Sequence, residues 1–239
     1  MKNFNIIPIL RRGWQETQDL FFPKNCLNCH TEGVWLCESC SDSLFFINSG
    51  FCPFCGALAD LFSVCKSCKA RTGIEKVFSV LKYSDPLAQK IIKNFKYRYV
   101  KDIAGDLEPI YRKFFAKYRI LLEINENTVI IPAPLHPYRE CERGYNQAEI
   151  LARVIGKILN LKIITDLVIK RTKTKNQADI PHRDRLGNLK GVFEAKESAY
   201  KDIIVVDDVF TTGSTVKELA AVLSAAGAER IRVITLARG

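Results

Sequence analysis

Hydrophobic and polar residues follow one another along the chain in the order expected for strands separated by helices. Residues 76–83 alternate like a strand, and residues 161–170 are expected to form a strand with a short loop. Continuous apolar strands are expected at 128–133 (TVIIPA), 201–208 (KDIIVVDD) and 230–237 (RIRVITLA). Apolar residues recur at helical intervals over residues 86–96, 102–119, 146–159 and 214–226. This order predicts an α/β fold with a mostly parallel sheet and flanking helices.

Helix start and stop signals divide the chain further. Asp85 followed by Pro86 predicts an N-cap and a proline at the first helical position. Residues 5–22 also have helical spacing, which ends at Pro23. We therefore predict an N-terminal helix (1–22), a cysteine-rich module (23–72) and an α/β domain (73–239).

Composition excludes several classes of protein. The chain has 239 residues, of which 47% are hydrophobic and 26% charged, which excludes wholesale disorder and a polytopic membrane protein. No stretch reaches the roughly 18 apolar residues of a membrane span. The apolar segment 4–10 is short for a secretory signal, and its basic residues follow it. The sequence thus predicts a cytoplasmic protein.

The net charge of +10 is unevenly distributed. Residues 76–190 carry 23 basic and 12 acidic side chains, whereas the flanking segments are nearly neutral. A basic excess indicates partners rather than a fold, and the candidates are nucleic acid, phosphorylated metabolites and acidic membrane surfaces.

Eight of the nine cysteines form four C-x2-C pairs. Thiolates two residues apart on a tight turn provide two corners of a tetrahedron, so two pairs make one closed structural zinc site. We predict two such sites from Cys26, Cys29, Cys37, Cys40, Cys52, Cys55, Cys65 and Cys68. Metal binding would supply the folding free energy of so small a module, which then binds nucleic acid or protein or braces a neighbouring domain.

Other interpretations of the cysteines are open. A redox pair usually stands alone beside a βαβ unit, and iron–sulfur ligation also uses cysteine pairs. Two zinc sites can form from consecutive pairs or as a cross-brace, and short loops favour the consecutive arrangement. Disulfides are disfavoured in a reducing compartment.

The clearest chemical signal follows the strand at 203–206. Asp207 and Asp208 come at its carboxyl end, where α/β sheets bind ligands. The small and hydroxylated residues Thr211, Thr212, Gly213, Ser214 and Thr215 then lead into a helix. Backbone N–H groups at a helix start bind phosphate, and carboxylates accept hydrogen bonds from ribose hydroxyls or lie near magnesium. This pattern predicts a ribose 5-phosphate site. The alternative is a solvated acidic loop with Ser214 as N-cap; a P-loop ATPase is excluded because its motif is absent.

The run VVDDVFTTGST resembles the phosphoribosyl-pyrophosphate loop of type I phosphoribosyltransferases. The resemblance implies that Asp207 and Asp208 contact the ribose hydroxyls and that residues 211–215 hold the 5′-phosphate, with magnesium accompanying phosphoribosyl pyrophosphate. It also implies that Arg139 and Arg143 form a pyrophosphate clamp. The mobile loop would contain Arg171, Lys173, Arg183 and Arg185. For both basic segments the alternative is a solvated loop, and His136 is expected to be structural.

The cysteine module, the segment P-L-H-P-x-R-x-x-x-R-G-Y-N-Q-A and VVDDVFTTGST, in this order, resemble the ComF family over residues 20–238. The resemblance implies handling of single-stranded DNA in natural transformation, with competence proteins as partners, in the cytoplasm or at the inner face of the membrane. An active transferase with an unidentified acceptor is the alternative.

A DNA binder would need a basic surface with stacking side chains. Over residues 93–101 aromatic and basic residues are interspersed. The aromatic residues are Phe95, Tyr97 and Tyr99, and the basic ones are Lys93, Lys96, Arg98 and Lys101. Such aromatic residues either stack on DNA bases or belong to the core. We expect the DNA-handling role and leave catalytic activity open.

Overall fold

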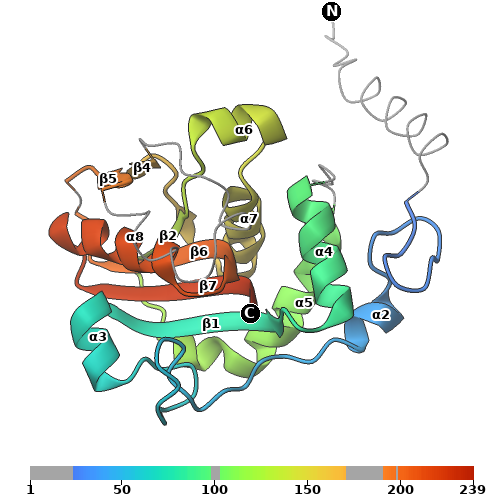
Figure 1. The fold of residues 1–239 in the computed structure, drawn as a ribbon, viewed down its shortest axis with the longest axis horizontal. Coiled ribbons are helices and arrows are strands. Elements are labelled where there is room, and N and C mark those ends of the chain that lie inside the picture. Colours follow the sequence, from blue (N-terminus) through green and yellow to red (C-terminus); the bar gives the residue numbers. More distant parts are fainter. Residues whose placement is uncertain (1–23, 98–102, 171–190, 198) are drawn as a thin grey trace, which may run out of the picture.

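A five-stranded sheet organises the chain, in the order β1-β7-β6-β2-β3 (Figure 1). The computed structural model describes residues 24–97, 103–170, 191–197 and 199–239. All neighbouring strands are parallel, which confirms the predicted α/β sheet. The strands are β1 (Ile74–Lys82), β2 (Thr128–Pro132), β3 (Lys162–Ile163), β6 (Asp202–Phe210) and β7 (Arg230–Arg238). The helix expected over residues 1–22 lies outside the described residues.

Successive residues of a strand point to opposite faces of the sheet, and here both sets of side chains are apolar. Helices therefore cover both faces. Ile204 and Val206 of β6 pack with the cluster formed by α4 (Pro86–Tyr97), α5 (Ile103–Tyr118) and α7 (Gln147–Leu159). Ile203 and Val205 pack on the other face, with α8 (Ser214–Ala225). Asp85 caps α4 as expected, since its carboxylate accepts from the backbone N–H groups of Leu87 and Ala88 at 2.8 and 3.1 Å.

The expectation for 161–170 needs correction, because its two strands belong to different sheets. β3 joins the main sheet, whereas β4 (Val168–Lys170) pairs antiparallel with β5 (Phe193–Ala195) in a second sheet. The chain leaves the main sheet after Ile163, and Val168 then pairs with Ala195. The remaining short elements are α2 (Glu38–Asp42), α3 (Lys66–Thr72), η1 (Arg119–Leu122) and α6 (Pro137–Arg143).

The cysteine-rich segment forms two ribbons that cover the free edge of β1, here called the first ribbon (residues 24–48) and the second ribbon (residues 49–72). Backbone hydrogen bonds join Ile47 N to Val80 O at 3.0 Å, and Val77 N to Phe62 O at 2.8 Å. Buried residues of the first ribbon belong to the core cluster of α5. The second ribbon contributes Cys52, Val64 and Cys68 to the cluster of α8, and Phe62 to that of α5. The ribbons thus brace both faces of the sheet and protect an edge that would otherwise offer unpaired backbone groups.

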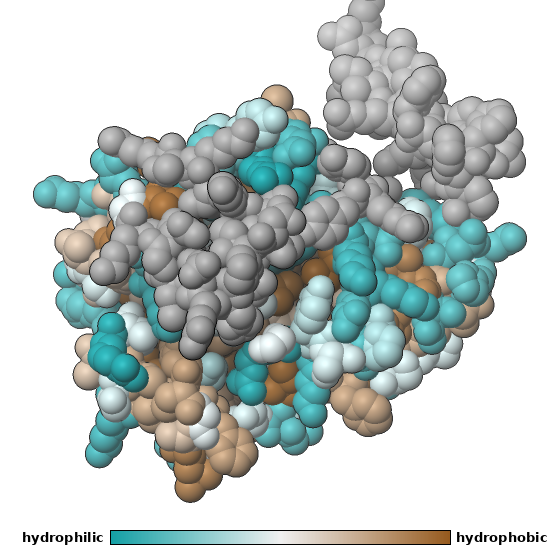
Figure 2. All heavy atoms as spheres, viewed as in Figure 1, coloured by the Kyte–Doolittle hydropathy of each residue, from teal (hydrophilic) through white to brown (hydrophobic). Residues whose placement is uncertain are grey.

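Apolar side chains remain exposed at the tip of the second ribbon. Phe51 and Leu58, which face each other across a β-bridge, are 53% and 82% exposed. Figure 2 shows hydrophobic surface below the position that β1 has in Figure 1. None of the helices in the described ranges has the length and apolar character needed to cross a membrane.

A buried ionic cluster joins three strands at the amino edge of the sheet. The side chain of Arg232 is 0% exposed and that of Asp202 7%, and the two form an ion pair. Arg232 also donates to the carbonyl oxygen of Glu123 at 3.0 Å, while Thr128 donates to Asp202 at 2.9 Å. Burial by itself raises the pKa of Asp202, but the hydrogen bond from Arg230 and the charge of Arg232 outweigh it and lower that pKa.

Candidate functional site

Asp207 and Asp208 lie where β6 approaches the carboxyl edge of the sheet, and both are half-buried. The backbone N–H of Asp208 donates to the carboxylate of Asp207 at 2.8 Å. Burial is the main reason that the pKa of Asp207 is raised to about 7, and the negative charge of Asp208 adds to it. Asp207 is therefore harder to ionise than an ordinary aspartate.

The loop after β6 has the geometry of an anion site. Gly213 adopts φ +71° and is the N-cap residue of α8, so Ser214, which was considered for this position, is the first helical residue instead. The hydroxyl groups of Thr212 and Ser214 lie 2.6 Å apart. The helix therefore starts directly at the loop, and backbone N–H groups with the positive end of the helix dipole attract an anion there.

Cations from two separate elements lie beside the acid pair. Lys96 of α4 forms an ion pair with Asp208 at 2.9 Å. Burial is the main reason that the pKa of Lys170 at the end of β4 is lowered; the charge of Asp207 opposes this shift and that of Arg139 adds to it. Lys170 therefore lies close enough to Asp207 for the two charges to interact, and Arg139 lies close to Lys170. Sequence reasoning missed Lys96 and Lys170 as site residues, although the position of Lys170 at a strand end was a usable signal.

The predicted pyrophosphate clamp lies on α6. Arg139 forms an ion pair with Glu142 at 3.1 Å, and Arg143 donates to Gln147 at the start of α7 at 3.2 Å. His136 is the N-cap of α6 and accepts from the backbone N–H of Tyr138 at 3.2 Å, which confirms its structural role. The segment predicted to form the mobile loop, with Arg171, Lys173, Arg183 and Arg185, lies outside the described residues.

The stacking interpretation is wrong for Phe95. Its side chain is 1% exposed and belongs to the core, and Tyr145 donates to its backbone carbonyl at 2.6 Å. The reason is that α4 is amphipathic and buries the stripe containing Phe95 against the α7 side of the core. The side chain of Tyr97 and residues 98–101 lie outside the described part of the chain.

The eight paired cysteines gather into two tetrads, Cys26/Cys29/Cys37/Cys40 and Cys52/Cys55/Cys65/Cys68, in which the sulfur atoms lie within 4.8 Å of one another. Consecutive pairs therefore come together, as expected, and the cross-brace is wrong. Sulfur atoms about 2.3 Å from a tetrahedral zinc ion stand about 3.8 Å apart, so the all-thiol tetrads fit zinc. Gly56 and His30 take positive φ values, 73° and 64°, where the turns of the ribbons require it.

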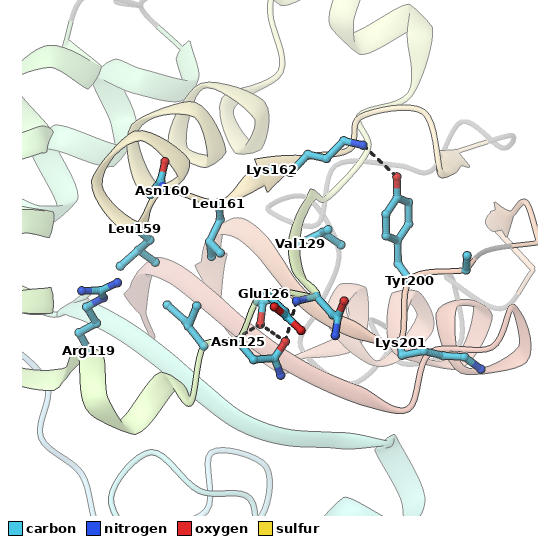
Figure 3. Close-up of a pocket in the computed structure, with 14 residues that line it drawn as sticks. Arg119, Asn125, Glu126, Val129, Leu159, Asn160, Leu161, Lys162, Tyr200 and Lys201 are labelled. Atoms are coloured by element: carbon cyan, nitrogen blue, oxygen red, sulfur yellow. Dashed lines mark hydrogen bonds between the residues drawn. The ribbon is translucent and has the colours of Figure 1, made fainter.

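A hollow of about 860 Å³ lies at the amino edge of the sheet, away from the acid pair (Figure 3). On its rim Lys162 contacts the hydroxyl of Tyr200 at 3.4 Å. Asn160, also on its rim, is the C-cap of α7. The carbonyl end of a helix carries partial negative charge and disfavours anions. A phosphate group is therefore expected to bind at the carboxyl edge of the sheet rather than in this hollow. Further lining residues include Arg119, Asn125, Val129, Leu159, Leu161 and Lys201.

Comparison with known proteins supports both parts of this architecture. Residues 17–74 match the family model of the double zinc ribbon domain, and residues 142–239 match that of the phosphoribosyl transferase domain. Competence protein F of Haemophilus influenzae is 29% identical over 228 residues, covering 91% of this chain and 98% of that protein. The chain is therefore similar to the ComF competence proteins along most of its length.

Two further relatives show the same similarity over most of the chain. Competence protein ComFC of Bacillus subtilis is 29% identical over 189 residues, covering 75% of this chain and 74% of that protein. DNA utilization protein YhgH of Escherichia coli is 28% identical over 210 residues, covering 86% and 92%. The ComF resemblance therefore extends through the zinc ribbons, the acid pair and the phosphate loop.

Proposed function

We propose that this ComF-like protein handles single-stranded DNA during DNA uptake, and that the carboxyl-edge site of its transferase domain holds a ribose 5-phosphate ligand. One observation carries the proposal: an acid pair beside an anion-binding loop, with the cations Lys96 and Lys170 close to it. The relatives named for competence and DNA utilization support the DNA role. By the same resemblance, we propose that it works with competence proteins in the cytoplasm, at the inner face of the membrane.

The acid pair suits a free ribose better than DNA. Asp207 and Asp208 would accept hydrogen bonds from two neighbouring hydroxyl groups, and a nucleotide inside a DNA strand offers none, because its 2′-OH is missing and its 3′ oxygen is esterified. Phosphoribosyl pyrophosphate is thus the preferred ligand of the site. Single-stranded DNA would bind the adjoining cations through its phosphates.

A binding competition tests this proposal. Labelled single-stranded DNA is titrated with the full chain at low salt, with and without magnesium phosphoribosyl pyrophosphate, for the wild type and the Asp207→Ala/Asp208→Ala variant. We expect the wild type to bind DNA, with an affinity that falls steeply as salt rises. Competition by the ligand should be lost in the variant if the two sites adjoin. Undetectable DNA binding by the wild type at low salt contradicts the DNA-handling role.

A second candidate function is phosphoribosyl transfer. The cations Lys170 and Arg139 favour it, because positive charge near a departing pyrophosphate stabilises the transition state. Bound magnesium would supply additional charge neutralisation for the pyrophosphate. The test measures pyrophosphate release from magnesium phosphoribosyl pyrophosphate with a panel of nucleobases and other amines as acceptors. Pyrophosphate release that is lost in the Asp207→Ala/Asp208→Ala variant would support transferase activity. Absence of pyrophosphate release with every acceptor would count against it.

The pH dependence of ligand binding should report Asp207. Its pKa is raised to about 7, so the group is largely protonated below pH 7 and ionised above it. A charged carboxylate accepts hydroxyl hydrogen bonds more strongly than a neutral acid. The affinity for ribose 5-phosphate should therefore rise between pH 6 and pH 8, by about ten-fold.

Calorimetric titration at several pH values measures this effect, with Asp207→Asn as the matched control. The phosphate of the ligand titrates in the same way with both proteins. The difference between their curves of affinity against pH therefore reports the titration of Asp207. Parallel curves for the two proteins would contradict the assignment.

A further inference from the structure

The second ribbon reaches the phosphate loop through one aromatic ring. Phe54 lies between the tetrad cysteines Cys52 and Cys55, in a turn closed by a hydrogen bond from Gly56 N to Cys52 O at 2.9 Å. Its ring packs against Phe210 at the end of β6, with centroids 5.4 Å apart and an interplanar angle of 62°. A residue held by the second tetrad thus contacts the strand end that leads into the phosphate loop.

The two rings close over the backbone of Gly213. A Cβ atom at Gly213 would lie 2.6 Å from Cε1 of Phe54 and 2.8 Å from Cζ of Phe210, closer than real Cβ contacts. Gly213 also needs its left-handed φ of +71° to begin α8. The Phe54 ring therefore bears directly on the residue that sets the direction of the N–H groups at the start of α8.

Phe54 also contacts the cation in the first turn of α8. The ammonium group of Lys217 lies 4.8 Å from the centroid of the Phe54 ring, within the range of a cation–π interaction. The same ammonium donates to the backbone carbonyl of Thr212 at 3.3 Å. The ring, the lysine and the loop backbone thus form one connected set of contacts around the candidate phosphate site.

We propose that Phe54 is a positioning residue through which the second tetrad shapes the phosphate loop for the 5′-phosphate of the ligand. This inference rests on the proposed ribose 5-phosphate site. Phosphate-binding loops gain affinity when their N–H groups are held in place before the ligand arrives, because less ordering remains to be done on binding. The tetrad fixes the turn that carries Phe54, and Phe54 in turn fixes Gly213.

The first ribbon offers an internal comparison, because it contacts a different element. The backbone N–H groups of Trp35 and Leu36 donate to the carboxylate of Asp106 on α5, at 2.7 and 3.2 Å. These contacts lie on the face of the sheet opposite to α8. The coupling to the phosphate loop is therefore assigned to the second ribbon.

The test compares Phe54→Ala and Phe54→Leu with Phe51→Leu, a control on the same ribbon whose side chain is 53% exposed. Calorimetry measures the affinity of each full-length protein for ribose 5-phosphate and, separately, for magnesium pyrophosphate. Zinc content and thermal unfolding are measured in parallel. We expect Phe54→Ala to weaken ribose 5-phosphate binding by about ten-fold or more, with Phe54→Leu intermediate. Pyrophosphate binding and zinc content should be unchanged, and Phe51→Leu should bind as the wild type does.

The possible outcomes separate the two proposals. A wild type that binds neither phosphoribosyl pyrophosphate nor ribose 5-phosphate overturns the proposed site and the inference together. If the wild type binds ribose 5-phosphate and Phe54→Ala binds it equally well, only the inference fails. Equal losses for ribose 5-phosphate and pyrophosphate indicate a general structural role and also overturn it. If Phe54→Ala does not fold, the same criteria apply to Phe54→Leu.

Discussion

Replacing Cys55 by serine is expected to reduce the zinc content of the protein from two ions per chain to one and to unfold the second ribbon. A serine hydroxyl is a poor replacement for a thiolate, and metal binding supplies most of the folding free energy of so small a module. Cys55 is an exposed member of its tetrad, so the substitution removes little packing in the core. The effect should therefore come from the lost ligand.

Cys29→Ser is the matched variant, because Cys29 has the same position and exposure in the first tetrad. Both variants should contain one zinc ion, measured by elemental analysis, and both should melt at a lower temperature than the wild type. Only Cys55→Ser should also weaken ribose 5-phosphate binding, since the first ribbon has its contacts on α5. Wild-type protein with well under two zinc ions per chain would contradict the two-site interpretation.

The second large effect is expected at the buried ion pair. Asp202→Ala should lower the free energy of unfolding by about 3–5 kcal/mol, because it leaves the fully buried guanidinium of Arg232 without its counter-charge. Denaturant unfolding measures the change. Glu229→Ala is the control, since the ion pair of Glu229 with Lys201 is exposed, and it should change stability little.

Two further measurements test the cause. Asp202→Leu combined with Arg232→Met removes both charges and should recover much of the lost stability. In the wild type the lowered pKa of Asp202 contributes stability above the ordinary pKa of aspartate, 3.8, and this contribution is lost as the pH falls through the lowered value. A single-variant loss below about 1 kcal/mol, or no recovery in the double variant, would contradict this account.

Much of the site could be predicted because its chemistry is local in the sequence. The acid pair, the loop through Thr215 and the cysteine pairs each lie on one short segment, and strand and helix periodicity placed the acid pair at a sheet edge. Local patterns did not reveal which cations would join them. Lys96 and Lys170 reach the acid pair from α4 and β4, elements that only the fold brings to the carboxyl edge.

The choice that was left open for Phe95 has the same origin. A stretch in which basic and aromatic residues alternate is compatible with a stacking surface or with one buried helix stripe, and the choice depends on what packs against the helix. Tyr145 and the start of α7 supply that neighbour, so Phe95 is buried. The strand after Leu161 was divided for a related reason, since partners elsewhere in the chain decide which sheet a short strand joins.

By itself, the sequence determined the parallel α/β domain and the two groups of cysteine ligands, and it predicted a ribose-phosphate site at the end of β6. Hydrophobic periodicity and ligand spacing are properties of neighbouring residues, so they can be read along the chain. Only the tertiary structure decided that consecutive cysteine pairs share a site, that the ribbons brace both faces of the sheet, and that Phe54 covers Gly213. These features depend on close packing between segments far apart in the chain, and no local pattern specifies which distant surface a side chain will meet.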